Sequence, residues 1–506
     1  MPAHTSHLDD SSSARVVVVG AGPTGLWLAA ELAAAGVHAV VLEQRTARSP
    51  HAKALGLMPR TLEVLALRGA VEPFIAAGRT VPAWHFGLLE ESVRFDTLDT
   101  PFPAMLLLPQ TTTEALLEER ARRLGVDVVR GAVATGLDQS EADETVTVTY
   151  EQDGAHRHVT AALVVGCDGG RSTVRGLAGI PFEGEPSSAW GFVGDVVLDA
   201  PPAPGTRVVR PDGALIVAPL PDGRFRLTGW DPEHQSPDEE LDLGTLRAFT
   251  RRMTGTDLGA RDPSWLSRFG DANRLAASFR SGRVLLAGDA AHVHWPTGGL
   301  GLNAGVQDAM ALGWRAAAVV RGTLPDTVLD DYATERRAYG EALRTSTLAQ
   351  SALITATDPA TIAIRATVNR MLATSGANRA VAARLAGLTR ESTLPAVRVV
   401  RAAPPIEDVV SDDDGARALF RSGRPVLMVS DPALHAAVRE SLDVVSDSVV
   451  VALVEPSAGA PALPRAAVFR PDGVRAWTSD DDGPVAAGLT AALGALGVLP
   501  ARAGGS

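Results

Sequence analysis

The amino-acid sequence predicts an α/β protein in which a Rossmann-like dinucleotide-binding domain carries an inserted, mostly-β domain and precedes a separate C-terminal domain. Three observations predict this arrangement. A β-branched run at residues 15–19 leads into the glycine-rich turn of residues 20–25 and then into an apolar helical stretch. Residues 181–280 have mainly strand-like patterns, and prolines with an acidic run at residues 404–414 mark a linker before the final segment.

The turn GAGPTG at residues 20–25 has the residue types that a dinucleotide pyrophosphate requires. Gly20 allows the tight turn, Gly22 allows the backbone to approach the phosphates, and Gly25 allows the helix to pack closely on the strand. Strand, glycines and helix follow one another in the order expected of a phosphate-binding βα unit.

The residues that flank these glycines complete the unit. Pro23 and Thr24 open the helix, whose free N–H groups and positive dipole end suit an anion. A second strand at residues 39–42 ends at Glu43, where a carboxylate can accept hydrogen bonds from the adenosine ribose.

Two further motifs join a buried strand to an acid and glycines. Residues 162–166 run into Asp168 and a glycine-rich turn, and residues 283–287 run into Gly288 and Asp289. At the carboxyl edge of a parallel sheet, the carboxylate of Asp289 can accept a hydrogen bond from a ribityl hydroxyl. Together with the first turn, these motifs predict one bound FAD.

A glycine-rich loop follows the third motif and begins a long helix that extends to about residue 320. We expect the N-terminus of this helix to point at the N1–C2=O edge of the isoalloxazine, where it would stabilise negative charge on the reduced flavin. The predicted contacts in this loop are Pro296, Gly299, Gly301, Leu302 and Asn303.

The remaining elements follow from hydrophobic periodicity. Helices are expected near residues 60–67 and 110–124, and residues 145–150 alternate as a half-exposed strand does. The inserted domain should contain strands at residues 191–198, 214–218 and 224–228. The C-terminal segment should contain strands at residues 425–429 and 449–454 and a hairpin at residues 467–473.

These elements divide the chain into four parts. We expect residues 1–14 to form a disordered tail. The FAD-binding domain comprises residues 15–71, 106–180 and 281–395, the substrate domain comprises residues 72–105 and 181–280, and the C-terminal domain comprises residues 396–506.

Composition narrows the class of protein. The chain of 506 residues is 45% hydrophobic and has a formal net charge of −12, which favours a large core and disfavours nucleic acid as a partner. No apolar segment reaches the ~18 residues that cross a bilayer, and residues 1–14 lack the apolar core of a signal peptide. Cys167 is the only cysteine, so the chain cannot form an internal disulfide and a reducing cytoplasm is expected. The protein is expected to be a monomer or a homodimer.

The motifs resemble those of the class A FAD-dependent aromatic hydroxylases, the superfamily that includes para-hydroxybenzoate hydroxylase. The subgroup of actinomycete aromatic polyketide hydroxylases and rifampicin monooxygenase is more similar still. The resemblance covers nearly the whole chain and rests on HAKALGLMPRTLE at residues 51–63, on LPQ at residues 108–110, and on residues 288–314 with their Gln-Asp-Ala triplet.

Several site residues follow from this resemblance. It implies that Thr24 and the glycines lie at the pyrophosphate, Glu43 at the adenosine ribose, Gln110 at the ribityl chain, and Asp289 at the ribityl or pyrophosphate region. The backbone of Leu302 and Asn303 should meet the flavin ring.

The resemblance implies that Lys53 takes the place where relatives often carry an arginine, near the flavin and the NADPH path. The sequence departs from the pattern of relatives in two other places. Gln44 and then Arg45 follow the ribose acid, where relatives have a basic residue first, and Leu300 replaces a common glutamine. These departures are local and leave the prediction of FAD intact.

The resemblance also implies a reaction. NADPH or NADH binds transiently and reduces the flavin, O2 forms a C4a-hydroperoxide, and oxygen is transferred to a phenolic, polycyclic aromatic polyketide in secondary metabolism. Two alternatives remain open: Baeyer–Villiger insertion of oxygen beside a ketone, and a flavin-binding protein without turnover.

A base that activates the phenol would assist hydroxylation. His85 and Asp231 are the candidates, although packing or surface roles are favoured for both. His292 and His294 stand two residues apart without a partnered acid motif, so no metal site is predicted. Relatives carry a thioredoxin-like C-terminal domain, and without CxxC this domain is expected to be structural or an assembly surface.

Overall fold

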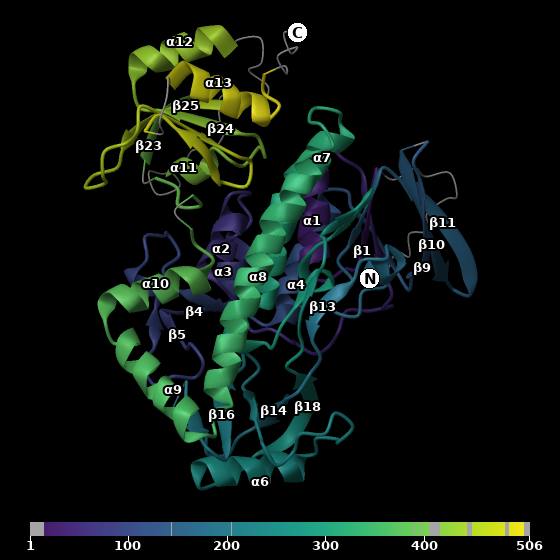
Figure 1. The fold of residues 1–506 in the computed structure, drawn as a ribbon, viewed down its shortest axis with the longest axis vertical. Helices are drawn as coiled ribbons and strands as arrows, with labels where there is room; N and C mark the ends of the chain where they lie inside the picture. Colours follow the sequence, from purple (N-terminus) through teal and green to yellow (C-terminus); the bar gives the residue numbers. More distant parts are fainter. Residues whose placement is uncertain are drawn as a thin grey trace.

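The computed structural model describes residues 15–142, 144–203, 205–389, 391–395, 397–403, 415–442, 448–480 and 485–499. The expected tail of residues 1–14 and the linker at residues 404–414 lie outside the described residues. The α/β class predicted from the sequence is confirmed (Figure 1).

A six-stranded sheet forms the centre of the molecule, in the order β20-β21-β12-β1-β2-β8. Its parallel strands are β1 (Val16–Val19), β2 (Ala39–Glu43), β8 (Asp127–Arg130), β12 (Leu163–Gly166) and β21 (Val284–Leu286), and β20 (Arg280–Ser281) is antiparallel at the edge. The register places Val17 of β1 between Val164 and Val40. The β1 valines are almost fully buried, as expected of a strand covered on both faces.

Helices cover this sheet. Helix α1 (Pro23–Ala34) packs on both α7 (Gly301–Val320) and α4 (Gln110–Arg123). A separate antiparallel sheet of β9 (Val133–Ser140), β10 (Thr145–Gln152) and β11 (Ala155–Ala161) stands at the right of Figure 1. Residues of β10 alternate between buried and partly exposed, which confirms the pattern predicted for residues 145–150.

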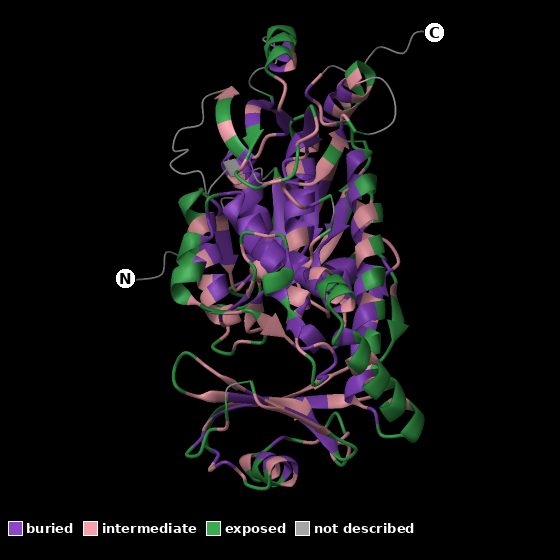
Figure 2. Ribbon diagram, turned by 90° about the vertical axis from the view of Figure 1, so that its left-hand side faces the viewer, coloured by how far each residue is buried: buried purple, intermediate pink, exposed green. Residues whose placement is uncertain are grey.

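The inserted domain is a five-stranded antiparallel sheet with α6 (Leu243–Thr254) on one face (Figure 2). Its order is β15 (Arg207–Arg210), β16 (Gly213–Pro219), β17 (Phe225–Trp230), β14 (Trp190–Val197) and β18 (Arg261–Gly270). Leu215 and Val217 pack against α6, whereas Ala214 and Ile216 face the FAD-binding domain. The three predicted strands are confirmed, and β15, β18 and α6 are additions that the sequence pattern did not reveal.

Shorter elements complete the two domains. They are β3 (Gly56–Leu57), α2 (Pro59–Ala66), α3 (Glu72–Ala77), β4 (Arg79–Val81), β5 (Ala83–Trp84), β6 (Val93–Arg94), β7 (Met105–Leu107), α5 (Thr173–Leu177), β13 (Phe182–Glu185), β19 (Asn273–Ala276) and β22 (His292–Val293). Helix α8 (Val328–Ile354) runs along the molecule from the C-terminal domain to the inserted sheet, and α9 (Pro359–Leu372) and α10 (Ser375–Ala386) turn back beside it (Figure 1).

The C-terminal domain has its own five-stranded sheet. The order is β23 (Val397–Ala403), β25 (Val450–Pro456), β24 (Val426–Val429), β26 (Ala466–Phe469) and β27 (Arg475–Thr478), with helices α11 (Gly415–Ala418), α12 (Pro432–Leu442) and α13 (Val485–Ala495). The predicted strands and hairpin of this segment are confirmed, and the thioredoxin-like assignment stays a prediction.

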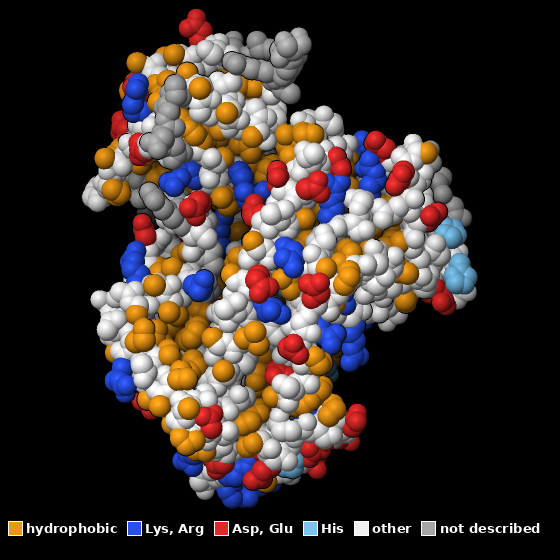
Figure 3. Space-filling view, viewed as in Figure 1, with side chains coloured by type: hydrophobic (Ala, Val, Ile, Leu, Met, Phe, Trp, Pro, Cys, Tyr) orange, Lys and Arg blue, Asp and Glu red, His pale blue; other side chains and the backbone are white. Residues whose placement is uncertain are grey.

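The surface does not carry a large field of one charge on the face shown in Figure 3, where acidic and basic side chains are interspersed. Among the described helices, none combines the length and the apolar character needed to cross a bilayer.

Candidate active site

The glycine-bearing motifs meet at one edge of the central sheet. Because β1, β2, β12 and β21 are parallel, their carboxyl ends lie along the same edge. Gly20 follows β1, Glu43 ends β2, Asp168 follows β12 and Asp289 follows β21. Segments that are far apart in the sequence therefore form one continuous site.

The first turn shows why each of its glycines is needed. Gly20 has a φ of +107°, and a Cβ there would lie 2.4 Å from the carbonyl oxygen of Cys167. A Cβ on Gly25 would lie 2.0 Å from the carbonyl oxygen of Gly20. At Gly22, by contrast, an added Cβ meets no atom of the described residues within 4 Å. Gly22 thus leaves open space at the helix end, as a cradle for a pyrophosphate requires.

Helix α1 begins beside this open space. Pro23 occupies its first turn, and the N-cap Gly22 provides no side-chain hydrogen bond, so N–H groups of the first turn remain available to an anion. The hydroxyl of Thr24 packs inward, 2.6 Å and 2.2 Å from the positions that Cβ atoms would take on Gly288 and Gly305. Because Gly288 and Gly305 have no Cβ, α1 can approach the third motif and α7 closely at Thr24.

Glu43 is held at the edge by backbone N–H groups. Its Oε2 accepts from the N–H of Ala21 at 2.8 Å and its Oε1 accepts from the N–H of Arg45 at 2.9 Å. Each oxygen retains a further lone pair for a ribose hydroxyl. The side chains of Gln44 and Arg45 are exposed beside it.

The acids of the second and third motifs have different surroundings. The carboxylate of Asp168 accepts from the Oγ of Ser172 at 2.5 Å and from two backbone N–H groups, those of Thr173 at 2.7 Å and Val174 at 3.1 Å. Asp168 therefore caps α5. Asp289 is exposed and its carboxylate accepts no hydrogen bond within the described residues, which leaves it available to a cofactor hydroxyl.

Helix α7 begins at the same edge without a capping side chain. The N–H groups of Gly301, Leu302 and Asn303 lie in its first turn, where no intrahelical acceptor precedes them. The Asn303 side chain is 2% exposed. It accepts from the N–H of Met58 at 2.7 Å and donates to the carbonyls of Gly56 at 3.1 Å and Gly299 at 2.8 Å. It thereby fixes the loop that holds Pro296 and Gly299 against β3.

The loop that carries Lys53 is tied to both domains. Gln110 accepts from the N–H of Ala54 at 3.1 Å and donates to Glu114 at 2.8 Å, so its side chain anchors this loop. The guanidinium of Arg226, from the inserted sheet, donates to the carbonyl of Lys53 at 3.3 Å. The Lys53 side chain is exposed.

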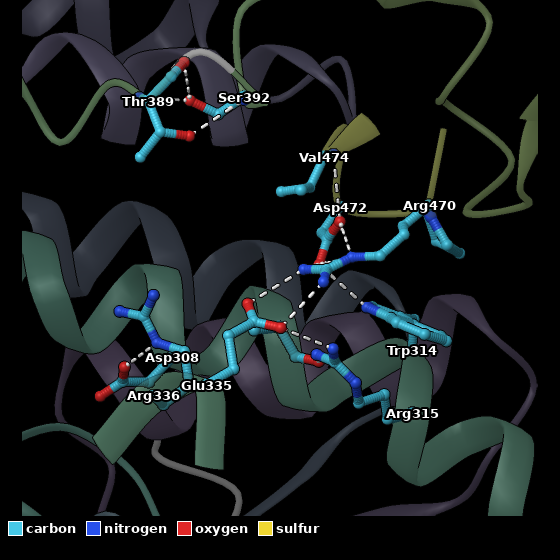
Figure 4. Close-up of polar contacts among 12 residues, drawn as sticks. Asp308, Trp314, Arg315, Glu335, Arg336, Thr389, Ser392, Arg470, Asp472 and Val474 are labelled. Atoms are coloured by element: carbon cyan, nitrogen blue, oxygen red, sulfur yellow. Dashed lines mark hydrogen bonds and ion pairs between the residues drawn. The ribbon is translucent and has the colours of Figure 1, made fainter. Parts of the chain in front are cut away.

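A buried network beneath the third motif was not predicted. Asp308 is fully buried, and its Oδ2 accepts from the N–H of Gly288 at 3.0 Å and lies 2.7 Å from the Nε2 of His292. The Nε of Arg336, from α8, lies 2.6 Å from its Oδ1 (Figure 4). The sequence contained Asp308 in a family triplet, but Arg336 belongs to no local motif.

Arg175 joins the second and third motifs. Its Nη1 donates to the carbonyl of Ala290 at 2.8 Å and its Nη2 donates to the carbonyl of Gly170 at 3.0 Å. The two loops therefore keep a fixed separation at the sheet edge.

We name the glycine-rich loop of residues 296–300, which precedes α7, the flavin loop. An apolar wall lies between this loop and the inserted sheet. It consists of buried Leu88, Ala214, Trp230, Trp295 and Ile354, with partly buried Ala189, Val209, Ile216 and Phe269 against them. Trp295 directly precedes Pro296 of the flavin loop, and its ring packs at 6.4 Å and 60° from that of Phe269. The partly buried members, including Ile216 and Phe269, therefore give apolar and aromatic surface over this buried core, beside the flavin loop.

Neither candidate base suits that role. Burial and, less strongly, the charge of Arg207 lower the pKa of His85 to about 3, so this imidazole is a poor proton acceptor for a phenol. Asp231 follows Trp230 and turns to the α6 face, where its carboxylate pairs with Arg252. Asp231 directly follows β17 and pairs with Arg252 of α6, so it lies away from the apolar wall, in the packing role favoured from the sequence.

The two histidines of the third motif are engaged separately. His292 pairs with Asp308, and the Nδ1 of His294 lies 2.8 Å from the carbonyl of Trp295. Within the described ranges, no group of three or more His, Cys, Asp or Glu side chains converges as metal ligands would.

Comparison with known proteins identifies the family. Residues 13–347 match the model of the FAD binding domain family. The uncharacterized aromatic compound monooxygenase YhjG of Bacillus subtilis (strain 168) is 40% identical over 479 residues, which span 92% of this chain and 95% of that protein.

A further relative and a solved structure also match nearly the whole chain. The 12-dehydrotetracycline 5-monooxygenase/anhydrotetracycline 6-monooxygenase of Streptomyces rimosus subsp. rimosus is 36% identical over 488 residues, 92% of this chain and 95% of that protein. The crystal structure of CabE, an aromatic hydroxylase from angucycline biosynthesis, matches with a TM-score of 0.82 and 35% identity, and covers 97% of this chain and 100% of that chain.

The matched sequence, the shared fold and a sheet edge that fits a flavin dinucleotide lead to one conclusion: this chain belongs to the FAD-dependent aromatic monooxygenases of class A, and its cofactor is FAD.

Proposed function

We propose that this monooxygenase hydroxylates a phenolic, polycyclic aromatic polyketide at the expense of NAD(P)H and O2. The products are the hydroxylated ring, NAD(P)+ and one water, so that one oxygen atom of O2 enters the substrate. The names of the relatives support this substrate class, because anhydrotetracycline and the angucyclines are polycyclic.

The apolar wall is the observation that carries the proposal. Trp295 belongs to the wall and also adjoins the flavin loop, so a flat ring system resting on the wall lies beside the cofactor. Fused aromatic rings gain free energy from apolar contact and from offset or edge-to-face packing on such side chains. A wall with Trp230 and Phe269 as well as Trp295 suits a substrate with several rings.

The protein contributes positioning and electrostatics. When bound, FAD accepts a hydride from NAD(P)H and activates O2 for transfer to an electron-rich ring. The proposed contacts place α1 at the pyrophosphate, Glu43 and Asp289 at hydroxyl groups, and the α7 N-terminus at the N1–C2=O edge. The dipole of α7 would stabilise negative charge on that edge of the bound flavin. Asn303 keeps the flavin loop in place through its three hydrogen bonds.

The test is turnover with product analysis. The purified protein should oxidise NADPH faster in the presence of a naphthoquinone-type or larger fused-ring phenol than in its absence, and mass spectrometry should show one added oxygen as a hydroxyl. A lactone or ester would assign Baeyer–Villiger insertion instead. No substrate-dependent oxidation across a broad panel of aromatic polyketides would overturn the proposal.

We propose that the enzyme acts in the cytoplasm as a monomer or homodimer. We also propose that its chain is divided into FAD-binding, substrate and C-terminal domains, as the sequence predicted. A single cysteine supports a reducing compartment. Light scattering on the purified protein tests the oligomeric state directly.

A further inference from the structure

The tight turn between β26 and β27 inserts into the FAD-binding domain. We name residues 470–473, Arg-Pro-Asp-Gly, the Arg470 turn. Asp472 is only 3% exposed, and the turn contacts Arg60 of α2, Trp314 of α7 and Glu335 of α8. Figure 4 shows Arg470 and Asp472 beside Glu335 and Trp314. Charged side chains of both signs also gather along this junction on the molecular surface (Figure 3).

Ion pairs hold the turn against α7 and α8. Arg470 makes a bidentate contact with Glu335, at 2.8 Å through Nη1 and 3.1 Å through Nη2. The Nη2 of Arg315 reaches the same carboxylate at 2.8 Å. Asp472 pairs with Arg470 and accepts from the indole N–H of Trp314 at 3.1 Å. Despite burial, these partners hold the pKa of Asp472 at about 2.

The main chain of the turn is bound as well. Arg60 of α2 donates to the carbonyl of Asp472 at 2.8 Å, and Arg68 donates to the carbonyl of Pro471 at 3.1 Å. Gly473 has a φ of +74°, and a Cβ on it would lie 2.9 Å from Leu67. The fit therefore depends on the backbone of the turn as well as on its charges.

The helices that hold the turn also hold the cofactor edge. On α8, Glu335 contacts the turn, and the next residue, Arg336, pairs with Asp308, which binds the N–H of Gly288. Near the start of α2, Arg60 contacts the turn, and two residues earlier the N–H of Met58 donates to Asn303. Two short chains of contacts thus connect the C-terminal domain to the flavin loops.

We infer that the Arg470 turn is a positioning element of the FAD site, so that docking of the C-terminal domain and binding of FAD strengthen each other. If docking raises the affinity for FAD, then FAD must stabilise docking by the same factor, because linkage between the two is reciprocal. The inference rests on the FAD assignment and is independent of the proposed substrate.

A matched pair of variants tests whether docking of the Arg470 turn raises the affinity for FAD. Arg470→Met removes the charge that joins Glu335 to Asp472, whereas Arg465→Met removes the partner of Asp431, a pair whose arginine side chain is 64% exposed on the same domain. Deflavinated full-length protein is titrated with FAD and the quenching of flavin fluorescence is followed. We expect Arg470→Met to bind FAD on the order of tenfold more weakly and Arg465→Met to bind as wild type. Equal affinities in all three proteins would overturn the inference.

Hydrogen exchange on the wild-type protein tests whether FAD stabilises docking of the Arg470 turn. This measurement does not depend on the folding of a variant. The amides of residues 466–478 should exchange on the order of tenfold more slowly with FAD than without it. The hairpin of residues 145–161, which lies on a separate sheet, serves as the reference and should change less. Unchanged exchange in residues 466–478 on saturation with FAD would overturn reciprocal coupling, whatever substrate the enzyme uses.

Discussion

The carboxylate of Asp308 and the guanidinium of Arg336 meet at 2.6 Å in a region that excludes solvent (Figure 4). Burial opposes the charged carboxylate, but Arg336 and His292, with their hydrogen bonds, keep the pKa of Asp308 below its ordinary value. The pair therefore stays ionised while Asp308 also holds the N–H of Gly288.

Replacing Asp308 should show how much the stability of the protein and its flavin content depend on this ion pair. We expect Asp308→Asn to lower the free energy of unfolding by about 3–5 kcal/mol, because Arg336 keeps a buried charge without its partner. The flavin content of the purified protein should fall as well. Glu341→Gln, which removes an ion pair whose glutamate is 49% exposed, should cost under ~1 kcal/mol in urea denaturation. Comparable losses in the two variants would contradict this account.

Two glycines of the first turn should separate cofactor binding from folding. Gly22 has an extended backbone, with φ −76° and ψ 179°, and open space around it, so Gly22→Ala should fold normally yet weaken FAD on the order of tenfold, about 1.4 kcal/mol. Gly25→Ala should lower both properties, because its Cβ collides with the Gly20 carbonyl at a cost of about 1–3 kcal/mol or more. Thermal unfolding of the apoproteins and FAD titration measure the two effects. Wild-type FAD affinity in Gly22→Ala would rule out this placement of the pyrophosphate.

Asp289 and Asp168, the acids of the third and second motifs, should likewise differ in whether they affect FAD affinity or stability. Asp289→Ala should reduce FAD affinity with little change in the unfolding free energy of the apoprotein, since Asp289 is exposed and makes no hydrogen bond within the described residues. Asp168→Ala should destabilise the apoprotein by about 1–3 kcal/mol, because it removes the acceptor for the N–H groups of Thr173 and Val174. Urea denaturation with and without FAD distinguishes them. A stability loss confined to Asp289→Ala would reverse the assignment.

His85 should make stability depend on pH. Its folded pKa of about 3 lies below the ordinary value of 6.5, so between these values the unfolded chain binds a proton that the native state does not. Stability therefore falls as pH drops through this window, by about 2 kcal/mol between pH 7.5 and pH 5.

The difference between two variants isolates this effect from other titrating groups. His85→Gln should lose about 2 kcal/mol less than wild type between pH 7.5 and pH 5, whereas His156→Gln, at an exposed position, should match wild type. Urea denaturation at both pH values supplies the free energies. If His85→Gln kept the wild-type pH dependence, the buried neutral state of His85 would be wrong.

The residues that could be predicted from the sequence lie within local motifs. Gly20, Gly22 and Gly25 lie within one turn, so their spacing in the sequence was enough to predict the turn. The positive φ of Gly20 and the close backbone contacts at Gly20 and Gly25 agree with that prediction. Asp289 was likewise placed by the strand that precedes it. Local pattern was enough because each group acts within a few residues of its neighbours.

The residues that could not be predicted depend on contacts between distant segments. Arg336 meets Asp308, and Arg470 meets Glu335, only because α7, α8 and the C-terminal hairpin pack together. A lone arginine in a helix or hairpin carries no signal of its partner. The packing role favoured for Asp231 agrees with its ion pair to Arg252, but the pattern did not show that its carboxylate lies on the α6 side of the sheet.

Two neighbouring residues on β16 can test whether the apolar wall is the substrate surface. Ile216 faces the FAD-binding domain within the apolar wall and is partly exposed, whereas Val217 is 2% exposed and packs toward α6. Because successive side chains of a strand point to opposite faces, the same substitution at the two positions changes different surroundings.

We expect Ile216→Trp to raise the KM for a fused-ring phenol on the order of tenfold, because the larger side chain occupies surface on which the rings would rest. Its FAD affinity and unfolding free energy should stay close to wild type. Val217→Trp should instead destabilise the protein by about 1–3 kcal/mol through overpacking beneath the sheet. Steady-state kinetics with phenols of one to four rings measure the first effect, which should increase with ring number. If Ile216→Trp left the KM unchanged for every phenol, the apolar wall would not be the substrate surface, although the FAD site would stand.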